Sequence, residues 1–137
     1  MKKILLILCC LPLLAIAQEQ SKIALVIGNA SYEDPNGVLK NPVNDSKLMS
    51  ETFTLLGFDS VIVANNLSYD AMRKVFRDYR SSLKKFDVGF IYYSGHGMQD
   101  AYNETYLIPI DFPPNSTIDD VTDYGYSIQD ILKSLNR

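Results

Sequence analysis

The chain has 137 residues, of which 47% are hydrophobic and 21% charged, a composition typical of one globular domain and unlike that of a disordered chain. Its formal net charge is -3, and no basic patch dominates the sequence, so we expect no nucleic-acid binding.

The first 17 residues have the pattern of a secretory signal peptide. Lys2 and Lys3 precede an apolar run, which ends in the small-x-small cleavage site Ala15-Ile16-Ala17. The apolar run is shorter than the roughly 20 residues that cross a bilayer, so we expect no transmembrane span. We therefore predict cleavage after Ala17 and a secreted or periplasmic mature domain that covers residues 18–137.

Both cysteines, Cys9 and Cys10, lie within this leader. A lipoprotein needs a small residue directly before its acylated cysteine, whereas Leu8 stands before Cys9, so this alternative fits poorly. A chain cleaved after Ala17 has no cysteine, and therefore no disulfide, no thiolate metal ligand and no thiol nucleophile.

The first half of the mature chain predicts two strands around one helix. Residues 22–28 (KIALVIG) are apolar throughout, which is typical of a buried parallel strand. Residues 29–43 are rich in Asn, Gly and Pro and predict a loop. A helix follows, with residues 44–46 as N-cap candidates and Gly57 as its C-cap. Its apolar face would hold Leu48, Met49, Phe53 and Leu56. Residues 58–64 predict the second strand.

The second half continues the alternation. Ser68 can cap a helix whose apolar residues recur every three or four positions through Leu83, and its charged face is interpreted as exposed to solvent. Residues 88–93 (VGFIYY) predict a third strand. Residues 105–110 predict a short or edge strand because of Pro109. Residues 111–126 predict a loop, and residues 127–135 a last helix.

This order predicts an α/β layered fold with a mostly parallel sheet flanked by helices. A helix that follows a strand in such a fold leads to another strand. Because none follows the last helix, we expect that the chain is cut within a larger domain.

His96 is the only histidine, and it lies between two glycines directly after the third predicted strand. Functional groups gather at the carboxyl ends of parallel strands, and a histidine there can act as a general base. A tight glycine turn with structural hydrogen bonds explains the same pattern equally well, so position alone leaves both interpretations open.

Other kinds of site find little support. The sequence has no glycine-rich phosphate loop with a lysine and no zinc-ligand spacing, so we expect no cofactor and no metal. Ser94 lies near His96, but no orienting acid is evident, which makes a serine hydrolase a poor fit.

The run FIYYSGHG, followed by LIPID at residues 107–111, resembles the histidine segment of the caspase, metacaspase and paracaspase superfamily. IALVIGNASY and LKNPVNDSKLMSETFTLLGF resemble its first strand and first helix. The resemblance covers residues 22–137, a p20-type domain, and the pattern is most similar to paracaspases and bacterial caspase-like proteins.

The resemblance implies a role for three residues. His96 matches the histidine of the Cys/His dyad, and Gly97 matches a glycine whose N–H contributes to the oxyanion hole. Asp45 matches an acidic residue that binds substrate in relatives that cleave after arginine or lysine. A plain helix cap explains Asp45 equally well, and Asn44 competes for that position.

The cysteine of the dyad is expected about 50 residues after the histidine in caspases, which is beyond Arg137. The resemblance therefore implies a cysteine endopeptidase domain, inactive as this chain alone, with a peptide or protein substrate and with the remainder of its own chain as partner. Two alternatives stay open: an inactive caspase-like pseudo-peptidase that acts as a binding module, and an unrelated flavodoxin-like binding domain.

Overall fold

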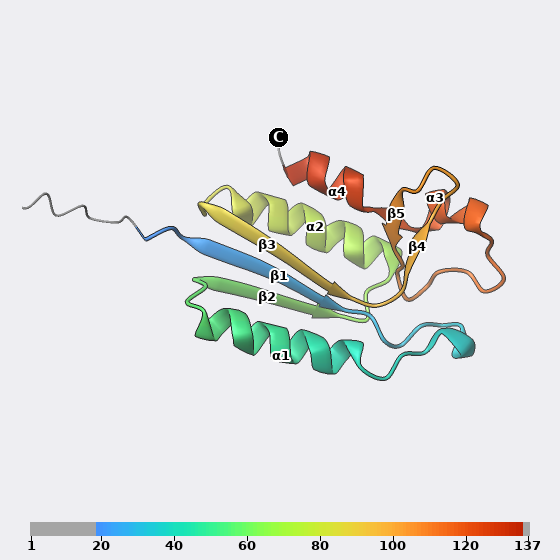
Figure 1. Ribbon diagram of the computed structural model, residues 1–137, viewed down its shortest axis with the longest axis horizontal. Coiled ribbons are helices and arrows are strands. Elements are labelled where there is room, and N and C mark those ends of the chain that lie inside the picture. The colour runs from blue at the N-terminus through green and yellow to red at the C-terminus, as the bar shows by residue number, and fades with distance from the viewer. Residues whose placement is uncertain (1–18, 136–137) are drawn as a thin grey trace, which may run out of the picture.

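The computed structural model describes residues 19–135, so the predicted leader with Cys9 and Cys10 lies outside the described residues. A three-stranded parallel sheet in the order β2-β1-β3 forms the centre. Helix α1 covers one face, and helices α2 and α4 cover the other (Figure 1). The bounds of the main elements are β1 Lys22–Gly28, α1 Pro42–Leu55, β2 Ser60–Asn65, α2 Tyr69–Leu83, β3 Val88–Ser94 and α4 Ile128–Leu135.

Strand β1 is the middle strand, and residues 23–28 are buried. It can be apolar at consecutive positions because both of its faces are covered, which confirms the prediction of a buried parallel strand. Ile23, Leu25 and Ile27 alternate toward α2 and α4 and form the main core with Met72 and Phe76.

Helix α2 packs on this face, and it forms where the sequence predicted a helix capped by Ser68. The Ser68 side chain accepts a hydrogen bond from the N–H of Ala71 and caps the helix. Met72, Phe76 and Tyr79 are buried at spacings of four and three. The Tyr79 hydroxyl donates to the carbonyl oxygen of Phe90 at 3.0 Å, and burial raises the pKa of Tyr79 to about 12, so the phenol stays a donor at neutral pH.

The predicted start of α1 is wrong. The helix begins at Pro42 with Asn41 as N-cap, and Asp45 lies inside the first turn, where its N–H donates to the carbonyl of Asn41. Neither Asn44 nor Asp45 is therefore a cap. Proline suits the first helical position because the N–H that it lacks would have no partner there.

The predicted apolar face of α1 is only partly right. Met49 and Phe53 are partly buried, whereas Leu48 and Leu56 are 62% and 61% exposed. Pro42 and Ser46 are the buried contacts of this helix. A small hydroxyl at Ser46, which donates to Asn65 Oδ1 at 2.7 Å, lets the helix approach the sheet closely.

A second, antiparallel sheet follows β3. Its strands in the order β4-β5-β6 are β4 Gly97–Gln99, β5 Thr105–Leu107 and β6 Tyr126–Ser127. The loop predicted for residues 111–126 is therefore partly wrong, because it also holds a 3-10 turn, η2 Ile118–Asp120, and a short helix, α3 Val121–Tyr124. The 3-10 turn η2 begins with a capping box between Thr117 and Asp120. This residue pattern is visible in the sequence and could have predicted the start of a helical segment.

Asn29 joins three segments at the carboxyl end of β1. Its side chain is fully buried; Nδ2 donates to the carbonyl oxygens of Ile108 and Leu67, and Oδ1 accepts from the N–H of Leu67 at 2.9 Å. A buried amide that satisfies three backbone groups fixes the loops before α2 and after β5 relative to the sheet.

Replacing Asn29 with alanine should lower the free energy of unfolding by about 2–4 kcal/mol, since it leaves the buried N–H of Leu67 without an acceptor and opens a small cavity. Urea unfolding followed by circular dichroism measures this change. The exposed Asn44 on α1 is the matched control, and Asn44→Ala should change stability by about 0.5 kcal/mol or less. Equal effects of the two variants would contradict the role of Asn29.

Candidate active site

The predicted site residues lie at the carboxyl edge of the parallel sheet. Strand β3 ends at Ser94, and Gly95 and His96 connect it to β4, which begins at Gly97 (Figure 1). This edge is where open α/β sheets gather functional groups, as the sequence predicted for His96.

The backbone of His96 is held by two tyrosines. Its N–H donates to the Tyr32 hydroxyl at 2.7 Å, and its carbonyl accepts from the Tyr93 hydroxyl at 3.0 Å and from the N–H of Ile108 at 3.0 Å. The Tyr32 ring packs against the imidazole with a centroid distance of 4.6 Å. These contacts fix both the position and the plane of the ring.

One nitrogen of the imidazole already has a partner. His96 Nε2 lies 2.7 Å from the carbonyl oxygen of Gly37 in the loop after β1. A carbonyl only accepts, so Nε2 carries the proton, and the neutral ring has its lone pair on Nδ1. The geometry therefore defines the tautomer in which Nδ1 can take up a proton.

Burial keeps both tyrosines neutral. It raises the pKa of Tyr32 and, more strongly, that of Tyr93, so both phenols remain protonated near neutral pH. Gly95 leaves room for these hydroxyls, because a Cβ there would lie 2.5 Å from Tyr93 Oη and 2.8 Å from Tyr32 Oη. Position 95 therefore requires glycine, because the two tyrosine hydroxyls lie too close to the backbone there for any side chain.

Gly97 presents its N–H away from the small sheet. Since Ile108 donates to the carbonyl of His96, the next pair along the ladder, Gly97 and Leu107, is a pair without hydrogen bonds. The exposed Gly97 can therefore donate to a group outside β5.

Asp45 is positioned by Ser94. The Ser94 hydroxyl donates to Asp45 Oδ2 at 2.9 Å, which ties the first turn of α1 to the last residue of β3. Asp45 is half-buried, and the N-terminal end of the helix favours its negative charge. Ser94 faces this carboxylate and makes no hydrogen bond with His96 within residues 19–135, which further disfavours a serine hydrolase.

A cavity of about 220 Å³ opens beside the histidine. It is lined by His96, Tyr32 and Gly37 and by residues of the loop after β5, which are Phe112, Pro113, Asn115 and Ser116. Asp45 does not line this cavity. Its link to the carboxyl end of β3 is the hydrogen bond from Ser94. Asp111, interpreted as structural, accepts from the N–H of Tyr69 at the start of α2.

Residues 19–135 contain no cysteine. Within the same residues, no three His, Cys, Asp or Glu side chains form a group that could hold a metal ion. No helix of this described part is long and apolar enough to cross a membrane.

The parallel sheet flanked by helices is the arrangement of a caspase-like α/β domain. The family model of the caspase domain matches residues 21–136, and the chain therefore belongs to this family. The chain is also similar to mucosa-associated lymphoid tissue lymphoma translocation protein 1 from Homo sapiens, with 30% identity over 94 residues, which is 69% of this chain. The Mus musculus homolog is 32% identical over 95 residues. The chain spans 11% of the length of each of these relatives.

Proposed function

We propose that this domain is the histidine-bearing part of a caspase-like cysteine endopeptidase. The observation that carries the proposal is the orientation of His96, whose Nε2 is bound to the carbonyl of Gly37 while Nδ1 has its lone pair available beside a cavity. A fixed tautomer at a strand end is what a thiol nucleophile requires of its base.

The nucleophile would be a cysteine in sequence after Arg137, on a strand that pairs with β3. Strand β3 is an edge of the described sheet, and it leaves Phe90 47% exposed with no proline or charged side chain to protect the edge within residues 88–94. Unprotected apolar edges are usually covered by another element, which supports a further strand at this position.

Two residues of this chain would take part in the reaction, His96 as general base and acid and Gly97 as a hydrogen-bond donor. His96 Nδ1 takes the proton of the cysteine thiol, and the sulfur attacks the peptide carbonyl carbon. The N–H of Gly97 stabilises the negative oxygen. The C–N bond then breaks, His96 returns the proton to the leaving amine, and water hydrolyses the thioester with His96 as base, which restores the thiol.

Asp45 would select the substrate. Its carboxylate is fixed by Ser94 and retains acceptor sites that could bind the side chain of an arginine or lysine before the cleaved bond. The substrate is accordingly a peptide or protein with a basic residue. The predicted leader with Lys2, Lys3 and Ala17 supports a secreted or periplasmic location for this activity.

The test uses the full-length protein with all the sequence that its gene encodes. It should hydrolyse arginyl or lysyl peptide reporters, and replacing the first cysteine after Arg137 with serine should abolish that hydrolysis. The chain that ends at Arg137 should be inactive. A full-length protein without such a cysteine, folded but without hydrolysis, would favour the inactive pseudo-peptidase that acts as a binding module.

A further inference from the structure

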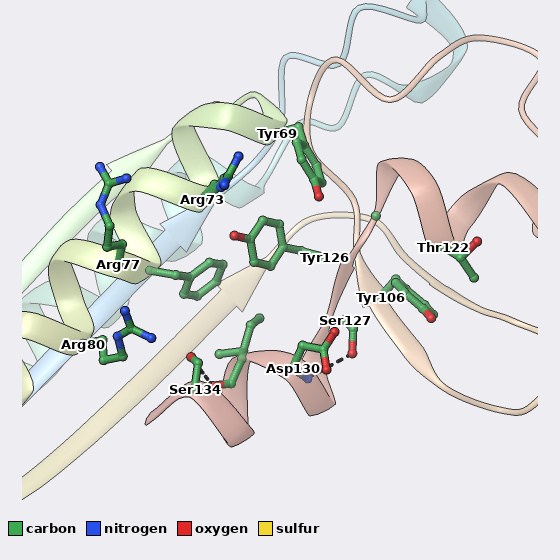
Figure 2. A pocket seen from close by; sticks show the side chains of 13 residues that line it. Tyr69, Arg73, Arg77, Arg80, Tyr106, Thr122, Tyr126, Ser127, Asp130 and Ser134 are labelled. Atoms are coloured by element: carbon green, nitrogen blue, oxygen red, sulfur yellow. Dashed lines mark hydrogen bonds between the residues drawn. The ribbon is translucent and has the colours of Figure 1, made fainter. Parts of the chain in front are cut away.

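A second and larger cavity lies beside helix α2. It has a volume of about 510 Å³ and runs between α2, α4 and β6 (Figure 2). It shares no lining residue with the His96 cavity. A ligand bound there would therefore leave the space beside His96 free, and the inference below does not rest on the proposed peptidase function.

One wall of this groove is basic. Arg73, Arg77 and Arg80 come from successive turns of α2 and line the groove. The Arg80 side chain points toward α4, whereas Arg73 and Arg77 extend along the outer side of the groove, away from α4 (Figure 2). The sequence predicted that these side chains lie on a solvated face, and Arg73 and Arg77 are exposed as predicted. They also line the groove next to helix α4. Three guanidinium groups in one groove contrast with the net charge of -3 of the chain.

These cations are only partly neutralised. Arg77 Nε lies 3.6 Å from Asp78 Oδ1, and among residues 19–135 neither Arg73 nor Arg80 has a carboxylate oxygen within 4.0 Å. Asp130, on the facing wall, is engaged by Lys133 at 3.5 Å. The groove therefore offers unpaired guanidinium groups, which bind carboxylates through two parallel hydrogen bonds.

The remaining lining fits a peptide. Tyr69 and Tyr126 stand in contact, with ring centroids 5.5 Å apart, and Phe76 and Ile131 supply apolar surface. Burial raises the pKa of Tyr126, and the positive charges of Arg73 and Arg77 oppose this shift. The Asp130 carboxylate would repel a dense phosphate polymer, whereas it can accept a peptide N–H.

The spacing of the arginines matches an extended chain. Arg73 and Arg77 are four residues apart on a helix, a rise of about 6 Å. Alternate side chains of an extended peptide are separated by about 6.6 Å and point to the same side. We propose that the groove between α2 and α4 binds an extended acidic peptide segment, with carboxylates at alternate positions on Arg73 and Arg77.

The experiment measures binding of a fluorescein-labelled peptide with alternating glutamate and alanine to the full-length protein by anisotropy. Arg73→Gln combined with Arg77→Gln should weaken binding about 10-fold or more, because two charge-assisted hydrogen-bond pairs are lost. The matched control is Lys84→Gln with Lys85→Gln, which removes the same charge from the exposed turn directly after α2, outside the groove, and should leave the Kd within about two-fold.

Backbone amide shifts provide a measurement that needs no variant. Titration of the same peptide into the wild-type protein should move the signals of residues 73–80 and 126–134 and leave those of residues 94–97 in place. Three results would overturn the proposal: no binding of the acidic peptide, equal weakening by both charge-matched pairs, or displacement of the peptide by an equal concentration of inorganic phosphate.

Discussion

Replacing His96 with alanine in the full-length protein is expected to lower kcat/KM for an arginyl peptide reporter by about 1,000-fold or more. General acid–base catalysis contributes about 100- to 10,000-fold, and here the same nitrogen would activate the thiol and protonate the leaving amine. The loss should appear in kcat, since His96 contributes to the transition state more than to substrate binding.

A glutamine at the same position separates catalysis from structure. His96→Gln can keep an N–H directed at the carbonyl of Gly37, the partner of Nε2 in the native protein, but it has no group that takes up a proton. Both variants should lose activity alike, whereas the glutamine variant should unfold closer to the wild-type temperature. If His96→Gln kept a tenth or more of the native kcat/KM, the proposed base would be wrong.

The elements that the sequence predicted well are those with a strong and simple pattern. Strand β1 is apolar throughout because it is the middle strand. Helix α2 has buried residues at regular spacings of four and three, and Ser68 marks its start as the N-cap. The start of α1 was missed because Asn41 caps it without a side-chain hydrogen bond, and the residues at positions 44–46 are equally good capping types that lie inside the helix. Strand β4 was missed because it has only three residues, too few to show the alternation of apolar and polar side chains that predicts a strand.

The candidate site could be predicted only in part. His96 was found because it is the single histidine and follows an apolar strand. Its partner Gly37 contributes a backbone carbonyl, which leaves no trace in the side-chain pattern, and Tyr32 lies 64 positions before it. The arginines of α2 have the spacing of an ordinary exposed face, and only the placement of α4 beside them reveals a groove.

Replacing Asp45 with asparagine is expected to lower kcat/KM about 100-fold for arginyl and lysyl reporters and only a few-fold for a reporter with an uncharged residue at that position. Asparagine has nearly the same shape, and its Oδ1 can still accept from the Ser94 hydroxyl. The change therefore removes the charge and keeps the local structure. An unpaired charge in a substrate pocket costs about 2–5 kcal/mol, which corresponds to a loss of this size.

Two further variants decide between substrate binding and a structural role for Asp45. Glu51→Gln removes one negative charge from the exposed side of the same helix and should leave the preference among reporters unchanged. Ser94→Ala keeps the carboxylate and frees it from its one side-chain donor, so selectivity for basic residues should survive with a modest loss of rate. If Asp45 only stabilises α1 against β3, Asp45→Asn would instead slow all reporters by one common factor and lower Tm together with the rate. A preserved Tm with a loss confined to basic reporters identifies a carboxylate that meets the substrate.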